Sequence, residues 1–239
     1  VAHFYEFDGS EWIKVDQVVS SAATTFGYFG RYVALDGHRA AIVSNDNYNN
    51  RAIIELFTKG QTGWYNTQTL YPPDGVADDG FGLSIEMDGD RLAIGQSLAT
   101  VDGLDNAGCI WLYELNEDGT ANQPQRITSP LPKPNEEFGI LLDLHEDNLF
   151  AGGARAVGTT LELARFKIMN GTVELRDRFD SVETNVENGF RPGRAIAADG
   201  QTLLVGLPGT GNGIVHAYDP RDCLCPADVN QDGLVTVSD

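Results

Sequence analysis

Four stretches of the sequence share one pattern: FGRYVALDGHRAAIVS (residues 29–44), FGLSIEMDGDRLAIGQS (81–97), FGILLDLHEDNLFAGGA (138–154) and FRPGRAIAADGQTLLVGLP (190–208). In each, alternating apolar residues lead to a polar turn and a second apolar stretch. Asp-Gly in this setting is the strongest short-range signal of a β-hairpin, because Gly accepts the positive φ of a type I′ turn. We therefore expect four hairpins, with turns at Asp36-Gly37, Asp88-Gly89, Glu146-Asp147 and Asp199-Gly200.

The first phenylalanines of these stretches lie 52, 57 and 52 residues apart, which indicates a structural repeat. After each hairpin and a polar loop the pattern predicts a third strand, and after most of these a fourth. The N-terminal residues have the pattern of a third and a fourth strand alone. The predicted third strands are residues 3–7, 52–57, 109–115, 161–167 and 214–218, and the fourth strands are 12–19, 64–70, 124–128 and 173–179.

A four-stranded sheet cannot cover both of its faces by itself, so neighbouring sheets must stack, and radial stacking gives a β-propeller. A β-sandwich is the competing all-β fold, but it gives no reason for this repeat period. We therefore predict an all-β protein, a β-propeller of four-stranded antiparallel blades with about four repeats visible. Four blades could close on themselves with one third strand left over; we favour a larger ring, for example seven-bladed, of which this chain is a piece.

The Phe-Gly openings, the Asp-Gly hairpins and the closing Gly206-Leu207-Pro208 resemble the FG-GAP repeat, the blade motif of integrin-α-like propellers. The resemblance covers residues 1 to about 220 and implies a fold more than a function, because propellers host many activities. Integrin-type blades often hold calcium in a long Asp-rich loop between the first two strands. The turns here are too short to surround a cation that takes about six to eight oxygen ligands, so we expect no calcium in the blades.

A second domain is predicted at residues 221–239, after the propeller repeats at 1–220. Its sequence ends in CLCPADVNQDGLVTVSD, with the spacing of an EF-hand calcium loop and Gly233 at the sharp turn. Asp at the last ligand position and Cys-Pro in place of an entering helix resemble the start of a type I dockerin, which implies calcium and a partner module or cell surface. The predicted calcium ligands are Asp228, Asn230, Asp232, Leu234 (through its carbonyl), Thr236 and Asp239. Occupancy of this half-module stays open.

Composition excludes several classes of partner. The chain has 35 acidic and 16 basic residues, a net charge of −19, and a field of this sign repels nucleic acid and anionic membrane surfaces. Its apolar runs are far shorter than the roughly 20 residues of a membrane-spanning helix, so we expect no membrane insertion. The three cysteines, Cys109, Cys223 and Cys225, form no recognisable framework, and their pairing stays open.

We predict no catalytic residues, because the sequence has neither a Gly-x-Ser-x-Gly elbow nor a His-Glu-x-x-His helix. His3 and His216 occupy the third-strand position held by Trp111 and are interpreted as packing residues. His38 and His145 lie at or beside hairpin turns and are expected in solvent.

Two polar loops between second and third strands are the candidate ligand-binding sites. The first contains Asp46, Asn47 and Tyr48, and the second contains Asp102 and Asp105. Their oxygens could bind a cation or sugar hydroxyls, with Tyr48 as a stacking face. The alternative is that both are ordinary surface loops with local Asx turns.

These observations favour a non-enzymatic, secreted or cell-surface binding or scaffold protein. Its propeller would present loops to a protein or polysaccharide, and its tail would attach in a calcium-dependent way. One alternative is a self-assembling structural subunit of a surface layer or filament, since an unpaired strand suits donated-strand contacts. Another is a secreted carbohydrate-active enzyme with carboxylates at the propeller mouth.

Overall fold

The structure is a computed structural model that describes residues 1–21, 27–45, 52–76, 79–153, 160–183, 196–200, 202–207 and 214–218. These residues form β-strands, turns and loops, and no helix occurs among them. The chain forms two compact units, one of Val1–Ile94 with Trp111–Gln125 and the other of Gly95–Ile110 with Arg126–Asp239.

Five sheets account for the strands, and three of them have four strands in sequential order. The N-terminal hairpin sheet is β1 (Ala2–Phe7) and β2 (Trp12–Val18); the first blade is β3 (Val33–Asp36), β4 (Arg39–Asn45), β5 (Ala52–Gly60) and β6 (Gly63–Leu70). The second blade is β7 (Phe81–Asp88), β8 (Arg91–Gln96), β9 (Cys109–Glu114) and β10 (Gln125–Thr128). The third blade is β11 (Leu141–His145), β12 (Asn148–Gly152), β13 (Thr160–Met169) and β14 (Thr172–Glu183), and the fourth is β15 (Ile196–Ala198), β16 (Leu203–Leu207) and β17 (Ile214–Tyr218). The predicted all-β class and its blade-like sheets are confirmed.

The hairpin turns differ in detail from the sequence prediction. Asp36 pairs with Arg39, so Asp36 ends its strand and the turn is Gly37 and the following histidine. The second blade has the same one-residue shift, with Gly89 first in the turn, whereas the prediction at Glu146-Asp147 was right. The first turn residue has positive φ in all three (54°, 60° and 51°), as primed hairpin turns require. The fourth hairpin is also present, with Ala198 paired with Leu203; Asp199 N donates to Thr202 O (3.2 Å), so Asp199 again lies before the turn rather than in it.

The Phe-Gly motif has a conformational cause. Gly30, Gly82 and Gly139 all have positive φ (93°, 77° and 91°), which side chains rarely adopt. A Cβ on Gly82 would lie 3.2 Å from Val43 Cγ1 of the first blade, and one on Gly139 would lie 2.7 Å from the carbonyl oxygen of Cys109 in β9. The motif therefore lets the first strands of the second and third blades start in close contact with the preceding blade, whereas a Cβ on Gly30 would meet nothing within 4 Å.

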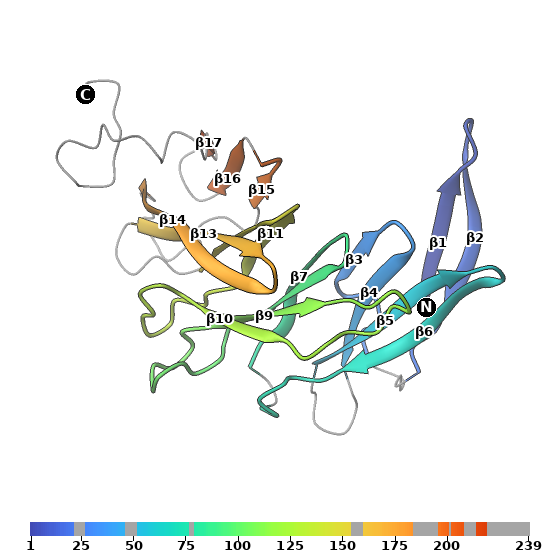
Figure 1. Cartoon of the computed structure of the whole chain (residues 1–239), viewed down its shortest axis with the longest axis horizontal. Coiled ribbons are helices and arrows are strands. Elements are labelled where there is room, and N and C mark those ends of the chain that lie inside the picture. The colour runs from blue at the N-terminus through green and yellow to red at the C-terminus, as the bar shows by residue number, and fades with distance from the viewer. Residues whose placement is uncertain are drawn as a thin grey trace. The chain divides into compact units, whose positions relative to one another are not determined.

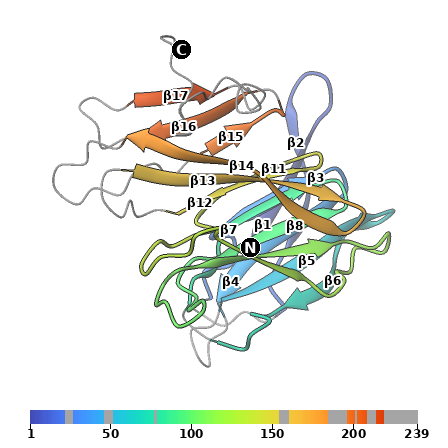
Figure 2. The same ribbon diagram turned by 60° about the vertical axis from the view of Figure 1, so that its left-hand side comes forward.

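Within each unit, one sheet covers the next through apolar side chains. In the first unit, the N-terminal hairpin sheet lies beside β6 of the first blade (Figure 1). Its residues Val18, Ala2 and Phe4 pack on the first blade, and Phe4 stacks on Trp64 with ring centroids 4.1 Å apart. In the second unit, the third and fourth blades lie face to face (Figure 2). Their shared cluster is Leu141, Phe150, Leu163, Phe179, Leu203 and Val205, with Ile140, Ile196, Ala198 and Tyr218 at its margin.

The packing role predicted for His3 is wrong. Trp111 is buried in the second blade, as predicted for this repeat position, but His3 is exposed. Tyr5, two residues further along β1, is also exposed, although the matching Phe57 in the first blade is buried. No described residue covers this face of the N-terminal hairpin sheet. The side chain of His216 lies outside the described residues.

Candidate functional site

The predicted site residues fall into two groups. Asp102 and Asp105 lie in a described loop, and both are exposed. The other predicted residues lie outside the described residues; these are Asp46, Asn47, Tyr48, Asp228, Asn230, Asp232, Leu234, Thr236 and Asp239. The candidate site that the structure describes is therefore the β8–β9 loop, residues 97–108.

The tip of the β8–β9 loop is a two-residue turn. Val101 and Leu104 pair across it, with Val101 N donating to Leu104 O (3.2 Å) and Leu104 N donating to Val101 O (2.8 Å). Asp102 and Gly103 between them have φ of 52° and 80°, the left-handed pair that an Asp-Gly turn adopts. Main-chain hydrogen bonds thus set the direction of the Asp102 side chain. The sequence analysis had considered a local Asx turn, in which a side-chain oxygen would do this instead.

The base of the loop is held by the chain that leads into the third blade. Asn135 N donates to Asp105 O (2.8 Å), and Phe138 N donates to Ala107 O (2.9 Å). Between them, the side-chain Nδ2 of Asn106 donates to Asn135 Oδ1 (3.0 Å), and the main-chain carbonyl oxygen of Asn106 accepts a hydrogen bond from Glu137 N (2.9 Å). This ladder fixes the backbone on both sides of Asp105.

Close packing leaves little freedom at the end of the loop. A Cβ on Gly108, whose φ is +82°, would lie 2.3 Å from Phe138 O and 2.8 Å from Ser97 O. Val101 and Ala107 are buried, while Asp102 and Asp105 are exposed. The loop therefore presents two carboxylates to solvent from a backbone that is buried and hydrogen-bonded on its other side.

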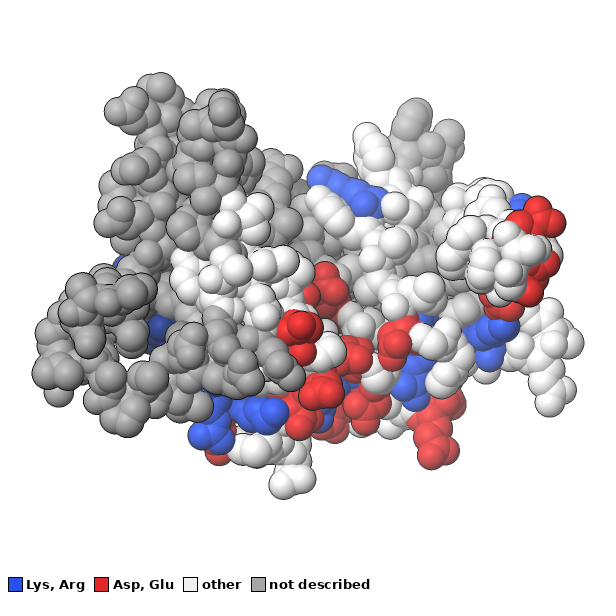
Figure 3. Space-filling view, turned by 90° about the horizontal axis from the view of Figure 1, so that it is seen from above, with Lys and Arg blue, Asp and Glu red and all other residues white. Residues whose placement is uncertain are grey.

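Acidic side chains elsewhere on the surface add to the charge of the molecule. On the face in Figure 3, acidic side chains form several patches among scattered basic ones. With a net charge of −19 over the whole sequence, the protein attracts cationic groups and repels polyanions.

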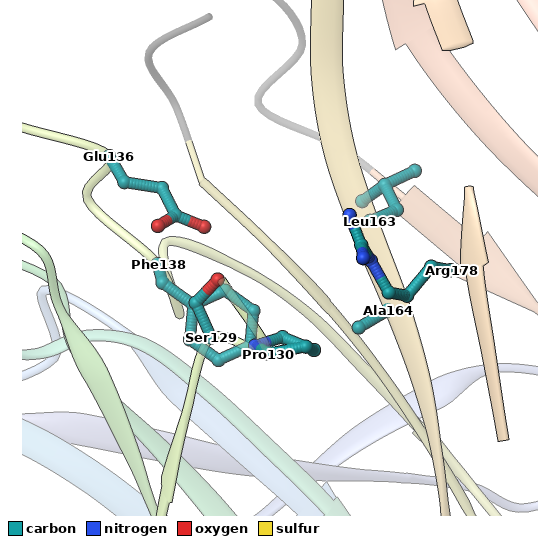
Figure 4. A pocket seen from close by; sticks show the side chains of 7 residues that line it. All are labelled: Ser129, Pro130, Glu136, Phe138, Leu163, Ala164 and Arg178. Carbon is teal, nitrogen blue, oxygen red and sulfur yellow. The ribbon is translucent and has the colours of Figure 1, made fainter. Parts of the chain in front are cut away.

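A small cavity lies near the loop's anchor. It has an empty volume of about 190 Å³ and is lined by Ser129, Pro130, Glu136, Phe138, Leu163, Ala164 and Arg178. The Glu136 carboxylate and the Arg178 guanidinium lie on opposite sides of it (Figure 4). Glu136 is buried, and its Oε2 accepts a hydrogen bond from Lys133 N (3.0 Å), so this carboxylate helps to shape the anchoring segment. This volume includes space that is open to solvent, so the feature is a shallow hollow and not an enclosed small-molecule pocket.

Sequence reasoning missed the anchoring residues. Asn106, Asn135 and Glu137 all adopt positive φ (52°, 59° and 58°), and none has an Asp-Gly signal that would reveal it. The one sequence signal that could have revealed these anchoring residues is their position, because they directly precede the Phe138-Gly139 motif. The Asp102-Gly103 pair is a turn signal in the sequence, but the sequence analysis treated this loop only as a polar one.

Among the described residues, no group of three or more His, Cys, Asp or Glu side chains is placed to hold a metal ion. Nor does that part of the chain contain a helix long and apolar enough to cross a membrane.

A model of the FG-GAP repeat family matches residues 64–113. This segment runs from β6 into β9 and contains the Phe81-Gly82 motif and the β7–β8 hairpin. A search of curated proteins found no match to the chain. The repeat and the sheet-rich fold fit an FG-GAP β-propeller, a fold that serves as a binding or adhesion-type domain. FG-GAP repeats occur in extracellular or cell-surface proteins.

Proposed function

We propose that this chain is a non-enzymatic binding or scaffold domain of a secreted or cell-surface protein. Its loops between second and third strands contact a protein or a polysaccharide. The observation that carries the proposal is the β8–β9 loop, which presents Asp102 and Asp105 from a backbone held by main-chain hydrogen bonds. A loop that is already ordered loses little conformational entropy when it binds, so it contributes affinity at low cost.

The chemistry of the loop favours particular ligands. Ionised carboxylates accept hydrogen bonds and form charge-assisted ones with Lys and Arg, so they suit sugar hydroxyls or basic protein side chains. Polyanionic ligands are disfavoured by the net charge of −19. The loop containing Asp46, Asn47 and Tyr48 occupies the same place in its repeat and is proposed to contribute to the same surface.

The test is sedimentation of the purified full chain with insoluble cellulose, xylan and chitin, and with polylysine-coated beads. The double variant Asp102→Asn, Asp105→Asn removes both charges, and Asn tolerates the left-handed conformation at residue 102. We expect it to bind the retained matrix at least about tenfold more weakly, while Glu117→Gln, an exposed acid in the β9–β10 loop, leaves binding unchanged.

Two results would reject the proposal. Equal binding by the double variant and the wild-type chain would remove the β8–β9 loop from the binding surface. Release of soluble sugar from any of the polysaccharides, lost in Asp46→Ala, Asp102→Ala or Asp105→Ala, would favour the carbohydrate-active enzyme instead.

The C-terminal segment is proposed to bind calcium and to mediate attachment. Its support is the spacing of Asp228, Asn230, Asp232 and Asp239, which matches an oxygen-rich cation loop. Calorimetric titration of the full chain with calcium chloride tests this. We expect saturable heat that is lost in Asp228→Ala; an unchanged titration in that variant would reject the tail as the calcium site and leave the loop proposal standing.

A further inference from the structure

The residue before the Phe-Gly motif adopts a left-handed backbone conformation in each of the first three blades. Its φ is 48° at Tyr28, 81° at Gly80 and 58° at Glu137. Gly adopts such angles freely, whereas a bulky side chain there is an outlier that costs stability. The Tyr28 side chain is 66% exposed, so packing offsets little of this cost. A strained residue whose side chain stays in solvent points to a role in binding.

A second exposed tyrosine precedes a rigid turn at the end of β6. Tyr71 is 49% exposed and is followed by Pro72 and Pro73, whose rings fix their own φ. Gly75 N donates to Pro72 O (2.9 Å), and Pro72 is buried, so the turn is closed and attached to the blade. Tyr71 therefore presents its ring at a low cost in conformational entropy.

The two tyrosines flank the same end of the first blade. Tyr28 precedes β3 and Tyr71 follows β6, and an even number of antiparallel strands in sequential order begins and finishes at one end of the sheet. A row of paired residues crosses this end from Tyr32 through β4 and β5 to Leu70. Neighbouring strands lie about 4.8 Å apart, so β3 and β6 are separated by about 14 Å. A ligand that contacts both tyrosines has to be extended.

The chemistry of the two side chains fits a neutral polysaccharide. Tyrosine presents a flat apolar ring and one hydroxyl group, which match the apolar faces and the hydroxyl groups of sugar rings. A protein partner usually buries a contiguous apolar core, whereas two rings about 14 Å apart suit a chain of linked sugars. The net charge of −19 disfavours acidic polysaccharides.

We propose that Tyr28 and Tyr71 are stacking residues for a neutral polysaccharide chain that lies along this end of the first blade. The inference rests on the proposed function and names the ligand class. Both tyrosines belong to the first compact unit, whereas Asp102 and Asp105 belong to the second, so separate variants test the two sites.

The test is a binding isotherm of the full chain on insoluble cellulose and on chitin, measured by depletion of the protein from solution. We expect saturable binding to at least one of the two polymers. Tyr71→Ala should bind it at least about fivefold more weakly, as loss of a contacting aromatic side chain typically does. Tyr65→Ala is the matched control, because Tyr65 is 51% exposed and lies near the other end of β6; its affinity should stay within about twofold of the wild-type value.

Tyr28→Gly separates a binding role from a structural one. Gly adopts the positive φ at little cost, so the melting temperature should rise, by roughly 2–4 °C for a chain of this size. Binding should nevertheless weaken by about fivefold, because the ring is lost. Tyr28→Phe keeps the ring and should keep most of the affinity.

Three results would overturn the inference. The first is wild-type affinity in both Tyr71→Ala and Tyr28→Gly, and the second is an equal loss in Tyr65→Ala. The third is retention on polylysine-coated beads but on neither polysaccharide, which would leave the proposed function standing with a protein ligand. Retention on none of these matrices would reject the proposed function as well.

Discussion

Two glycines of the β8–β9 loop allow the steric part of its anchoring to be measured. Gly103 and Gly108 have nearly equal φ, +80° and +82°, so alanine at either position adopts a left-handed conformation that costs about 1–2 kcal/mol. They differ in what a Cβ meets: nothing lies within 4 Å at Gly103, whereas three main-chain atoms of Phe138 and Ser97 lie within 2.8 Å at Gly108. Backbone cannot yield as a flexible side chain does, so Gly108→Ala adds about 1–3 kcal/mol of overpacking.

We expect Gly103→Ala to lower the free energy of unfolding by about 1–2 kcal/mol and Gly108→Ala by about 2–5 kcal/mol. For a protein of this size, the difference of about 2 kcal/mol lowers the melting temperature by a further 4–8 °C or so. Circular dichroism during heating and urea titration measures both variants against the wild-type chain. Equal effects at the two positions would refute the close contact between the loop and Phe138 on which the site depends.

Further predictions follow from single buried groups. Asp177 in β14 forms an ion pair with Arg165 in β13, and both side chains are largely buried. Asp177→Ala should therefore lower the free energy of unfolding, measured by urea titration, by about 3–5 kcal/mol. Glu6→Ala removes an exposed ion pair and should lower it by less than about 1 kcal/mol. Similar losses in both variants would contradict this assignment. Burial raises the pKa of the Tyr113 phenol, so stability should fall as pH rises above about 10, where the unfolded tyrosine ionises and the folded one does not; Tyr113→Phe should reduce this fall. The buried Cys109 thiol should react with Ellman's reagent only on unfolding, and Cys109→Ser should then lose one reactive thiol per chain; reaction of Cys109 in the native state would contradict its burial.

The sequence predicted the strands well because their signals are local. The fourth-blade strand at Ile214–Tyr218 was placed with its observed bounds, and the hairpin at Glu146-Asp147 was correct. Alternating apolar residues and turn residues act within a few positions of each other, so a short segment of sequence indicates both a strand and the turn that ends it. The one-residue error at Asp36 arose because Gly can occupy the first place of a turn as well as the second.

The candidate site was predicted only in part because its shape depends on distant residues. Asp102 and Asp105 could be chosen from their polar setting, but their support comes from residues 135–138, about thirty positions away. Asn adopts positive φ more often than most residues, so Asn106 carried a weak signal, but the positive φ of Glu137 has no signature in its residue type. Burial misled in the same way at His3, where the repeat position predicted packing but no described residue covers that face.

The anchoring of the β8–β9 loop also bears on how such a repeat could change its ligand. Most hydrogen bonds that hold the loop run between main-chain groups, such as Phe138 N to Ala107 O and Asn135 N to Asp105 O. These bonds do not require a particular side chain at Asp102 or Asp105, whose carboxylates are directed to solvent. The side chains that would touch a ligand can therefore change without loss of the backbone that positions them, because a rigid scaffold supports the variable loop. Removal of the two charges should accordingly alter binding while leaving the unfolding free energy within about 0.5 kcal/mol of the wild-type value.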